Sequence, residues 1–519
     1  MMASDARFLY PNGRQYVTAR PAVPERPEGR LYGAMETMTD TLTSKTTEPG
    51  TTLAVPARRI YLMKDLPPEV VAVAFAKTSR SPEPFDVIAQ ELTEAKSSQF
   101  HEKWVVGYGH ASVAEHAILS LAVENVSILA AKAIEDNRLA SYTEKSTRYQ
   151  IYDPDHVYRP AAFHKRPDLN RKFEDLVTEL TTAYIAWSEK AVAYLRQVDP
   201  CPSDKSPKVW ETRLRAKSCD AIRYLLPTAT LTNLGWTINA RALAHAIRKL
   251  TGSPLDELRE IGTELKATAI EKVPTLLKYA DPDEARVAGG RSIADSLTAK
   301  IPAVARMNAE APPTVKLLQF DQDGLRRLAC AVAYANQPGE WGHVEQTLAG
   351  WSDEQLLDLV RKSVEPLGQF DPMPRAFEHL NYLVEITVDY GAWRDIQRHR
   401  IGTQTAQELS PDLGYTIPAL IKDLGLRGEF ERLIEKSASV YDALKPEFPN
   451  EAVYALMLAF RKRSLFGWNL REVIHFVKLR GGVKGHDAYR AVAQDVWREV
   501  VAAQPWLTKI VSPLGPDFK

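Results

Sequence analysis

Three consecutive residues, Arg398, His399 and Arg400, place two guanidinium groups on either side of an imidazole. A guanidinium group binds phosphate through several donors held in one plane, and it also stacks on flat rings. The neighbouring positive charges favour the neutral form of the imidazole, because they disfavour a further cation. The triplet therefore indicates a site for an anion that carries a planar ring. For the triplet taken alone, a solvated basic helix end is the alternative.

A second cluster of reactive side chains lies in a polar segment that contains Glu144, Ser146, Arg148 and Tyr149. A nucleoside monophosphate needs such a mixture, since a guanidinium pairs with phosphate and the other groups form hydrogen bonds with sugar and base. Arg223 is an isolated basic residue within an apolar run, and it is a further candidate for phosphate. The alternatives are a polar surface loop for the segment and a helix-surface arginine for Arg223.

Other common reaction centres are not indicated by the sequence. The cysteines Cys201, Cys219 and Cys330 are widely spaced and form no CxxC pair. This spacing argues against a disulfide scaffold and a cysteine-rich zinc site, and it suits a reducing compartment. The histidines show no HExxH spacing, so we expect no metal site. Neither a GxGxxG nor a GxxxxGK[ST] loop is present, which argues against a doubly wound nucleotide-binding fold.

The region around the arginine triplet has a counterpart earlier in the chain. Residues 109–149 and 374–415 each contain a Glu-His pair, an apolar stretch, a short helix-like run, an arginine and a polar segment that ends in tyrosine. The spacing between Arg138 and Arg400 is nearly the same as that between the two Glu-His pairs. Similar features in the same order indicate an internal repeat.

A second repeated block follows the first in both halves, with Asn, Arg and His at equal spacing: Asn239, Arg241 and His245, and then Asn469, Arg471 and His475. We interpret the chain as a tandem duplication, with units at 57–280 and 314–519 and a linker at 281–313. The first unit is longer between its blocks, and we expect the extra residues at 152–207. Residues 1–56 are rich in proline and polar residues and are expected to form a flexible arm.

The hydrophobic pattern predicts the elements that position these side chains. Apolar and polar residues alternate over 379–390, which predicts a half-buried strand, and residues 117–123 are its counterpart. Residues 469–480 are predicted to form a helix with Asn469 and Glu472 in a capping box and with a glycine pair at its end. Each unit is therefore predicted to be an α+β domain, an antiparallel sheet with packed helices.

The composition limits the class of protein. A length of 519 residues suggests two large domains or about three of ordinary size. The 66 basic and 66 acidic side chains balance, which argues against a protein that coats nucleic acid. No stretch approaches the roughly 18 to 20 apolar residues of a membrane helix, and we find no secretory signal. We therefore expect a cytoplasmic protein that binds neither nucleic acid nor membrane.

Together, these motifs resemble those of flavin-dependent thymidylate synthases. The similarity begins with the segment from His110 and Ser112 to His116 and continues through the polar segment that ends at Tyr149. The Arg-His-Arg triplet matches the flavin-binding triplet of that family, and the Arg223-Tyr-Leu-Leu-Pro run and the Asn-x-Arg…His blocks follow in order. The resemblance covers most of both units and implies two tandem copies of that family's α+β domain.

The resemblance also implies a reaction and a set of roles. Members of the family methylate deoxyuridine monophosphate (dUMP) to dTMP with carbon from methylene-tetrahydrofolate and hydride from FAD, which NADPH reduces. It implies that Arg480 polarises the pyrimidine, with Ser146 as a second catalytic residue. The implied nucleotide-binding residues are Glu144, Ser146, Arg148 and Arg223. The implied cofactor-binding residues are Arg398, His399, Arg400, Asn469, Arg471, His475, Ser112, Asn239, Arg241 and His245.

The two halves lack different parts of the family's pattern. At the triplet the first half has Asp136, whose charge would repel a pyrophosphate. The second half has Val453 where the first has Arg223, and the first has Leu250 where the second has Arg480. Family sites combine several subunits of a homotetramer. We therefore expect the halves to divide the labour and two chains to form a homodimer that mimics the tetramer.

Two alternative functions stay open. The changed loop around Ser410 and the leucine at position 250 are consistent with a flavin enzyme of the same fold that acts on another pyrimidine or nucleotide. The losses in both halves are consistent with a non-catalytic flavin- or nucleotide-binding protein. Flavin that copurifies with the protein, followed by growth of a thymidine-requiring strain, would separate these functions.

Overall fold

The computed structural model describes residues 59–513, apart from positions 64, 80, 108–109, 154, 298–299, 302–304, 369 and 483–484. The flexible arm predicted for residues 1–56 lies outside the described residues. Residues 63–519 form one compact unit. Within the described part of the chain, no helix is long and apolar enough to cross a membrane.

The first half begins with short helices and continues as alternating strands and helices. Its elements are α1 (Pro68–Lys77), α2 (Phe85–Gln90), α3 (Glu94–Phe100), the π-helix η1 (His101–Gly107), η2 (Ala111–His116), β1 (Ile118–Ser127), α4 (Ile128–Glu135), β2 (Ala140–Glu144), η3 (Ala161–Lys165), α5 (Pro167–Val198), α6 (Pro207–Ile222), η4 (Arg223–Leu225), β3 (Leu231–Asn239), α7 (Ala240–Thr251), α8 (Asp256–Ala269) and α9 (Pro274–Leu277). The segment that was predicted as a linker contains α10 (Glu284–Leu297).

The second half repeats this order of elements. They are β4 (Thr314–Phe320), α11 (Gly324–Asn336), α12 (Trp341–Ala349), α13 (Asp353–Val364), η5 (Arg375–His379), β5 (Asn381–Asp389), α14 (Tyr390–Ile396), β6 (Thr403–Ala406), η6 (Pro411–Leu413), α15 (Ala419–Asp423), α16 (Arg427–Leu444), η7 (Glu451–Ala455), β7 (Arg461–Asn469), α17 (Leu470–Arg480), α18 (Asp487–Ala503) and η8 (Pro505–Lys509).

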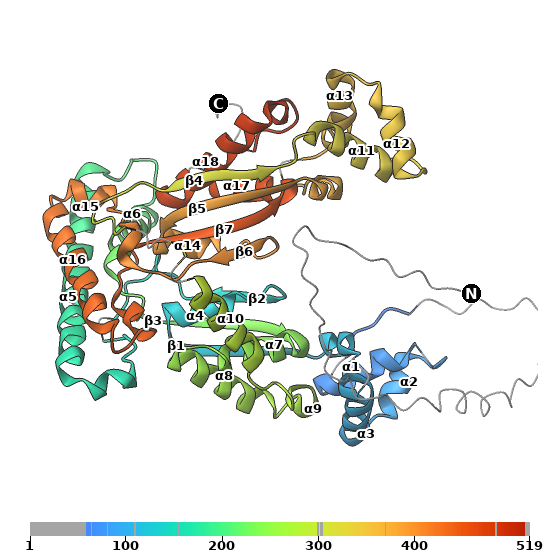
Figure 1. Cartoon of the computed structure of the whole chain (residues 1–519), viewed down its shortest axis with the longest axis horizontal. Helices are drawn as coiled ribbons and strands as arrows, with labels where there is room; N and C mark the ends of the chain where they lie inside the picture. The colour runs from blue at the N-terminus through green and yellow to red at the C-terminus, as the bar shows by residue number, and fades with distance from the viewer. Residues whose placement is uncertain are drawn as a thin grey trace, which may run out of the picture. The chain divides into compact units, whose positions relative to one another are not determined.

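Three strands of each sheet have equivalent antiparallel topology, and β4 has no counterpart in the described part of the first half. Strand order is β1-β3-β2 in the first half and β4-β5-β7-β6 in the second. Ile118 of β1 pairs with Asn239, and Asn381 of β5 pairs with Asn469, so the repeated asparagines occupy equivalent register positions. The two sheets face each other, with β2 and β6 on adjoining sides (Figure 1). The predicted α+β fold and tandem arrangement are confirmed.

The halves meet around a local two-fold axis. The backbone N–H of Thr228 donates to the carbonyl of Leu456 at 2.8 Å, and the N–H of Leu458 donates to the carbonyl of Leu226 at 2.9 Å. In the repeat, Leu226 corresponds to Leu456 and Thr228 corresponds to Leu458. Exchanging the two halves therefore turns each of these hydrogen bonds into the other. The same contact therefore occurs twice, as at the interface of a symmetric dimer.

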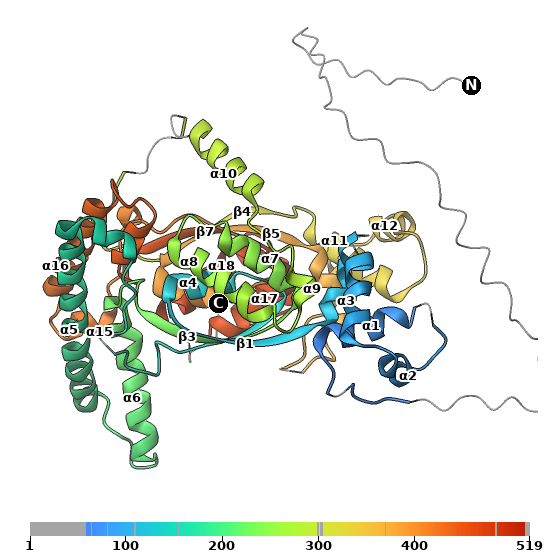
Figure 2. The same cartoon turned by 90° about the horizontal axis from the view of Figure 1, so that it is seen from below.

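The first half departs from the repeat mainly in its helices. Helix α5 has 32 residues and its counterpart α16 has 18, and α6 follows α5 without a counterpart in the second half. The extra residues that we predicted at 152–207 therefore lie in that region but extend through α6 to Ile222. The two long helices lie side by side (Figures 1 and 2). Trp187 packs against Phe430 there, so the halves share one apolar core.

The elements around the triplet follow the predicted pattern with two corrections. The predicted strand is β5, but its last four residues are all buried rather than alternating, and α18 packs against this strand. The predicted helix is α17, and the Asn469 side chain accepts a hydrogen bond from the Glu472 N–H at 2.9 Å. The capping-box prediction for the Glu472 side chain is wrong, because its carboxylate binds His399 at 2.8 Å instead.

A buried carboxylate, Asp389, begins α14 and predicts a measurable pH dependence. Its Oδ1 accepts from the Ala392 N–H at 2.7 Å, and burial raises its pKa to about 6. Because the folded state holds this proton more tightly than the unfolded state, stability falls as pH rises from about 4 through about 6. We expect the free energy of unfolding of the wild type to fall between pH 5 and pH 8. In Asp389→Asn this fall should be smaller, by on the order of 2 kcal/mol. Urea unfolding at both pH values measures it, and an unchanged difference would contradict the assignment.

Candidate functional site

A buried carboxylate of the first half, Glu144 at the end of β2, contacts cations from both halves. Its Oε1 is 2.7 Å from Arg394 Nη2, and its Oε2 is 2.7 Å from Lys132 Nζ and 3.3 Å from Arg398 Nη2. Burial alone would raise the pKa of Glu144, but Arg394 and Lys132 outweigh burial and lower it to about 2. The carboxylate therefore stays ionised and joins the polar segment of the first half to the arginine triplet of the second.

The imidazole of the triplet, His399, lies between a carboxylate and a guanidinium group of α17. Its Nδ1 is 2.8 Å from Glu472 Oε1, and its Nε2 is 3.2 Å from Arg480 Nε. Burial lowers the pKa of His399, although Glu472 acts in the opposite direction. A neutral imidazole that donates from Nδ1 to Glu472 and accepts at Nε2 from Arg480 satisfies both contacts. The expectation of a neutral imidazole therefore has a second cause, which is burial.

A second acid, the mostly buried Asp395 of α14, holds arginines from both halves. Its carboxylate is 3.9 Å from Arg223 Nη2 and 3.6 Å from Arg480 Nη1. Burial raises the pKa of Asp395, but Arg223, Arg398 and Arg480 lower it further than burial raises it. Arg223 also donates to Thr147 Oγ1 at 3.3 Å. Within the described residues, its buried Nε and Nη2 have no hydrogen-bond partner.

The arginine of the polar segment, Arg148, lies beside the same cluster. It forms a two-point ion pair with Asp220 at 2.6 and 2.9 Å and donates to Tyr489 Oη at 3.0 Å. Arg480 lies over the ring of the same tyrosine, 5.3 Å from its centroid. Ser146 accepts a hydrogen bond from the Arg148 N–H at 3.2 Å, so its hydroxyl shapes this turn.

A cavity of about 320 Å³ opens beside the triplet. It is lined by Glu135, Tyr142, Arg398, His399, Arg400, Ile401, Glu472, His475, Leu479 and Arg480. The Arg400 guanidinium lies over the Tyr142 ring, 4.6 Å from its centroid, and its buried Nε has no partner within the described part of the chain. Cations and flat rings at one opening suit an anionic ligand with a planar ring.

The repeated Asn and Arg residues have equivalent structural contacts in both halves. Asn239 and Asn469 cap α7 and α17. Arg241 pairs with Glu115, and Arg471 pairs with Glu378 at 2.6 Å. The histidines of these blocks line cavities: His475 faces the triplet, and His245 lies in the first half's equivalent cavity. Ser112 is exposed on η2 and lines neither of these cavities.

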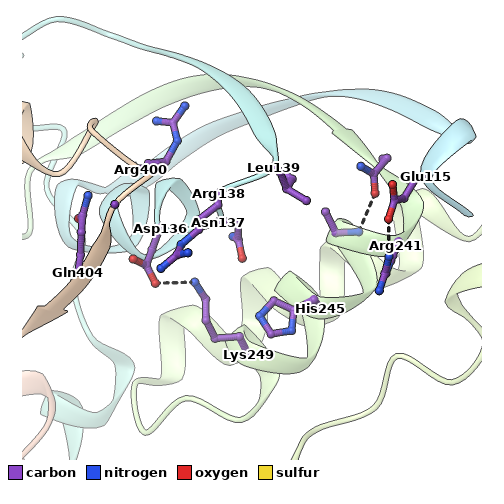
Figure 3. Close-up of a pocket in the computed structure, with 13 residues that line it drawn as sticks. Glu115, Asp136, Asn137, Arg138, Leu139, Arg241, His245, Lys249, Arg400 and Gln404 are labelled. Carbon is purple, nitrogen blue, oxygen red and sulfur yellow. Dashed lines mark hydrogen bonds and ion pairs between the residues drawn. The ribbon is translucent and has the colours of Figure 1, made fainter. Parts of the chain in front are cut away.

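The equivalent cavity of the first half, about 650 Å³, has different charges. Figure 3 shows Asp136 paired with Lys249, at 3.1 Å, on the wall of this cavity. The lysine offsets the charge of Asp136, which weakens the sequence-based argument that this aspartate repels a pyrophosphate. Arg400 reaches across the local axis and lines this cavity as well as the smaller one.

Sequence reasoning missed the acids that hold the arginines in place. Asp395, Glu472 and Asp220 each contact at least one predicted site arginine or histidine. One signal was available in the repeat: Lys132 and Arg394 are cations at equivalent positions in mostly apolar helices, and both bind Glu144. A cation kept twice on a buried helix indicates a buried acid nearby.

The fold and the site define a protein built from two copies of one α+β unit, with a shared cluster of arginines and acids at their junction. The chain belongs to the family described as thymidylate synthase complementing protein, whose model matches residues 61–275 and 317–506. Both halves match the family model, so the resemblance inferred from the motifs is confirmed.

Two kinds of relative illustrate this membership. A UPF0159 protein of Chlamydia muridarum is 30% identical over 86% of this chain and 90% of its own length, and one of Chlamydia pneumoniae is 31% identical with the same coverage. A flavin-dependent thymidylate synthase of Clostridium tetani is 27% identical over 43% of this chain and 87% of its own length. The Clostridium protein therefore has about half the length of this chain, as expected for a single unit.

Proposed function

We propose that this protein is a flavin-dependent thymidylate synthase whose two halves supply different parts of each active site. The observation that carries the proposal is the convergence of Glu144, Arg148 and Arg223 from the first half with the triplet and Arg480 from the second. These side chains meet through two acids: Asp395 pairs with Arg223 and Arg480, and Glu144 of the first half pairs with Arg398 of the second. The relatives named as flavin-dependent thymidylate synthases support the reaction class.

The residues present suit the ligands of that reaction. The buried Nε and Nη2 atoms of Arg223, which have no hydrogen-bond partner within the described residues, are donors that a nucleotide phosphate would satisfy. The triplet cavity would hold the flavin through Arg398, His399 and Arg400. When bound, FAD supplies hydride to the carbon that methylene-tetrahydrofolate provides, with NADPH as its reductant.

The protein's own contribution is the position and charge of Arg480. His399 and Asp395 hold its guanidinium from two sides, and Glu472 in turn orients His399. A fixed cation stabilises negative charge that develops on a pyrimidine, and it does so at little reorganisation cost because it is already in place. Glu144 keeps Arg394 and Arg398 oriented toward the same junction.

Cysteine nucleophiles do not fit this site. Burial raises the pKa of the Cys219 thiol to about 11, so it is protonated at neutral pH. Cys330 is buried as well, with a raised pKa, and Cys201 is exposed after α5. The reaction therefore needs an activation route other than a thiolate, which agrees with a flavin-dependent mechanism.

The proposal predicts that flavin retention depends on one triplet and not on its counterpart. His399 and Asn137 occupy equivalent positions, and each lines only one of the two cavities. We expect His399→Ala to lower the flavin content of the purified protein at least tenfold and Asn137→Ala to leave it near the wild-type value. Arg400→Ala should also lose flavin, while Asp136→Ala should keep it. Absorbance at 450 nm per chain measures the content, and equal loss from both halves would contradict the division of labour.

The reaction itself is tested by complementation. A thymidine-requiring bacterial strain that expresses this chain should grow without thymidine, and purified protein should form dTMP from dUMP, methylene-tetrahydrofolate and NADPH. A protein that binds FAD but fails both tests would favour a flavin enzyme with another substrate. A protein without flavin would favour the non-catalytic alternative. We also propose that the active form is a homodimer of this chain, which size-exclusion chromatography with light scattering measures.

A further inference from the structure

The local two-fold axis relates the candidate site to a second set of positions that has lost its charges. Where the candidate site has Glu144, Asp395 and Arg480, the equivalent positions hold small or apolar residues, namely Ala406, Ala133 and Leu250. The structure has a cavity of about 890 Å³ there, and all three of these residues line it. One of the two equivalent regions is therefore filled by ion pairs, and the other is open.

This larger cavity has features that its counterpart lacks. Helix α10 forms part of its wall through Val287 and Ala294, and no equivalent helix follows the second half within the described residues. Apolar side chains of α7 and α8, including Leu250 and Leu258, line another part. The cavity shares Asp136, His245, Lys249 and Gln404 with the 650 Å³ cavity shown in Figure 3. Its size is within the usual range for small-molecule sites.

One wall carries a cation without a counter-ion. Lys462, at the start of β7, takes the place of Thr232 in the repeat, and its ammonium lies 4.2 Å from the centroid of the Trp393 ring and 5.5 Å from that of Tyr390. No carboxylate of the described residues lies within ion-pair distance of it. Burial lowers the pKa of Lys462 to about 8, and Glu408 and Asp136, which face it from farther away, only partly offset this effect. A half-buried ammonium without a nearby carboxylate would gain from an anion beside it.

A buried side chain of the same wall, Gln397, has one polar atom without a hydrogen-bond partner within the described residues. The Gln397 side chain is 5% exposed and lines the cavity. Its Nε2 donates to the Lys132 carbonyl at 2.9 Å. Its Oε1 has no hydrogen-bond partner within the described part of the chain. A ligand with a ring N–H group would satisfy this acceptor, and leaving it unsatisfied costs free energy.

We propose that this cavity is a second binding site, for a nucleoside monophosphate whose phosphate pairs with Lys462 and whose base donates a hydrogen bond to Gln397. The sugar and base would lie against the apolar wall of α7, α8 and α10. The proposal rests on the duplication, on Lys462, which has no counter-ion, and on the Oε1 of Gln397, which has no hydrogen-bond partner within the described residues. It holds whether or not the candidate active site makes dTMP.

Calorimetric titration of the full-length, flavin-loaded protein with dUMP, with AMP and with inorganic phosphate tests the proposal. We expect two classes of nucleotide site in the wild type. Arg223→Met should remove the class at the candidate active site, and Lys462→Met should weaken the other class by about 10- to 100-fold. The matched control is Lys422→Met, which removes an exposed lysine from the same half as Lys462. Lys422 pairs with Glu310, and its loss should change neither class of site.

A second variant separates loss of the site from loss of the fold. Val287→Trp fills the cavity from the partly exposed helix α10, so it should block the Lys462-dependent class and leave the melting temperature within a few degrees of the wild-type value. The proposal is overturned if Lys462→Met and Val287→Trp retain every class of site, or if Arg223→Met alone removes all nucleotide binding. Phosphate that binds as tightly as a nucleotide would contradict the role of Gln397. If instead the proposed function is wrong, Arg223→Met should bind nucleotide with the same classes of site as the wild type.

Discussion

Arg480→Ala is expected to lower the rate of dTMP formation by about 10²- to 10³-fold, the usual cost of removing one preorganised charged donor. The guanidinium contacts His399 and Asp395, and a methyl group can replace neither contact. The rate of Arg480→Lys should fall between those of the wild type and Arg480→Ala, because an ammonium keeps the charge but cannot present the planar set of donors. Initial rates with purified protein and growth of a thymidine-requiring strain measure the effect.

A matched arginine on the neighbouring helix serves as the control. Arg498 of α18 is 59% exposed and pairs only with Asp495 among the contacts that the structure describes. We expect Arg498→Ala to retain activity within a factor of two. Thermal unfolding of all three variants checks that the Arg480 variants are folded. Full activity in Arg480→Ala would contradict the proposed role, and so would an activity loss that simply follows a fall in melting temperature.

Glu144→Ala is expected to have the largest effect on stability, about 3–5 kcal/mol in the free energy of unfolding. The substitution leaves Arg394 buried without its closest counter-ion, and Lys132 keeps only Glu135. Glu144→Gln should cost nearly as much, because it removes the charge that Arg394 and Lys132 need, although it keeps the shape of the side chain. Guanidinium chloride unfolding at neutral pH measures these differences.

The same ion pairs predict how this stabilisation changes with pH. The pKa of Glu144 is lowered to about 2, so its contribution is fully present above the ordinary carboxyl range near 4. It is lost as pH falls from about 4 through about 2. The control is Glu211→Ala, which removes a partly exposed partner of Arg196 and should cost at most about 1 kcal/mol. If Glu144→Ala costs no more than this control, the buried cluster does not stabilise the fold as we infer.

The repeat made the main architecture predictable from the sequence. Residues such as Arg138 and Arg400 recur at nearly constant spacing, and a duplicated α+β unit follows from that spacing without knowledge of any contact. The strand over 381–389 and the helix over 470–480 follow from local patterns, which depend on residues close in sequence. Even the grouping of arginines from both halves was predictable from the complementary losses.

The partners of those arginines were not predictable in the same way. Asp395 contacts Arg223 of the other half, so this contact exists only once the two halves have packed together. Glu472 contacts His399 within the second half, but the two residues are far apart in sequence. The capping-box pattern pointed Glu472 toward its own helix, but a buried imidazole competes for its carboxylate. Local propensity was overridden there by a tertiary contact, as happens often at functional sites.

The repeated Asn-x-Arg pattern shows why spacing alone does not define a binding role. Asn239 and Asn469 cap their helices, and Arg241 and Arg471 pair with acids of the preceding short helix in both halves. These contacts explain the pattern structurally, whatever the residues bind. In the first half Asn239 and Arg241 line a cavity together with His245, whereas in the second half His475 lines the cavity at the triplet and Asn469 and Arg471 do not.

The reciprocal hydrogen bonds between Thr228 and Leu456 and between Leu458 and Leu226 have a genetic consequence. In a homodimer a single codon change alters both sides of such an interface at once, so a damaging change is doubled. In one continuous chain each side is encoded separately, and the covalent connection keeps the pair together at high effective concentration. Substitutions can then accumulate on one side alone while the other side preserves the ancestral chemistry.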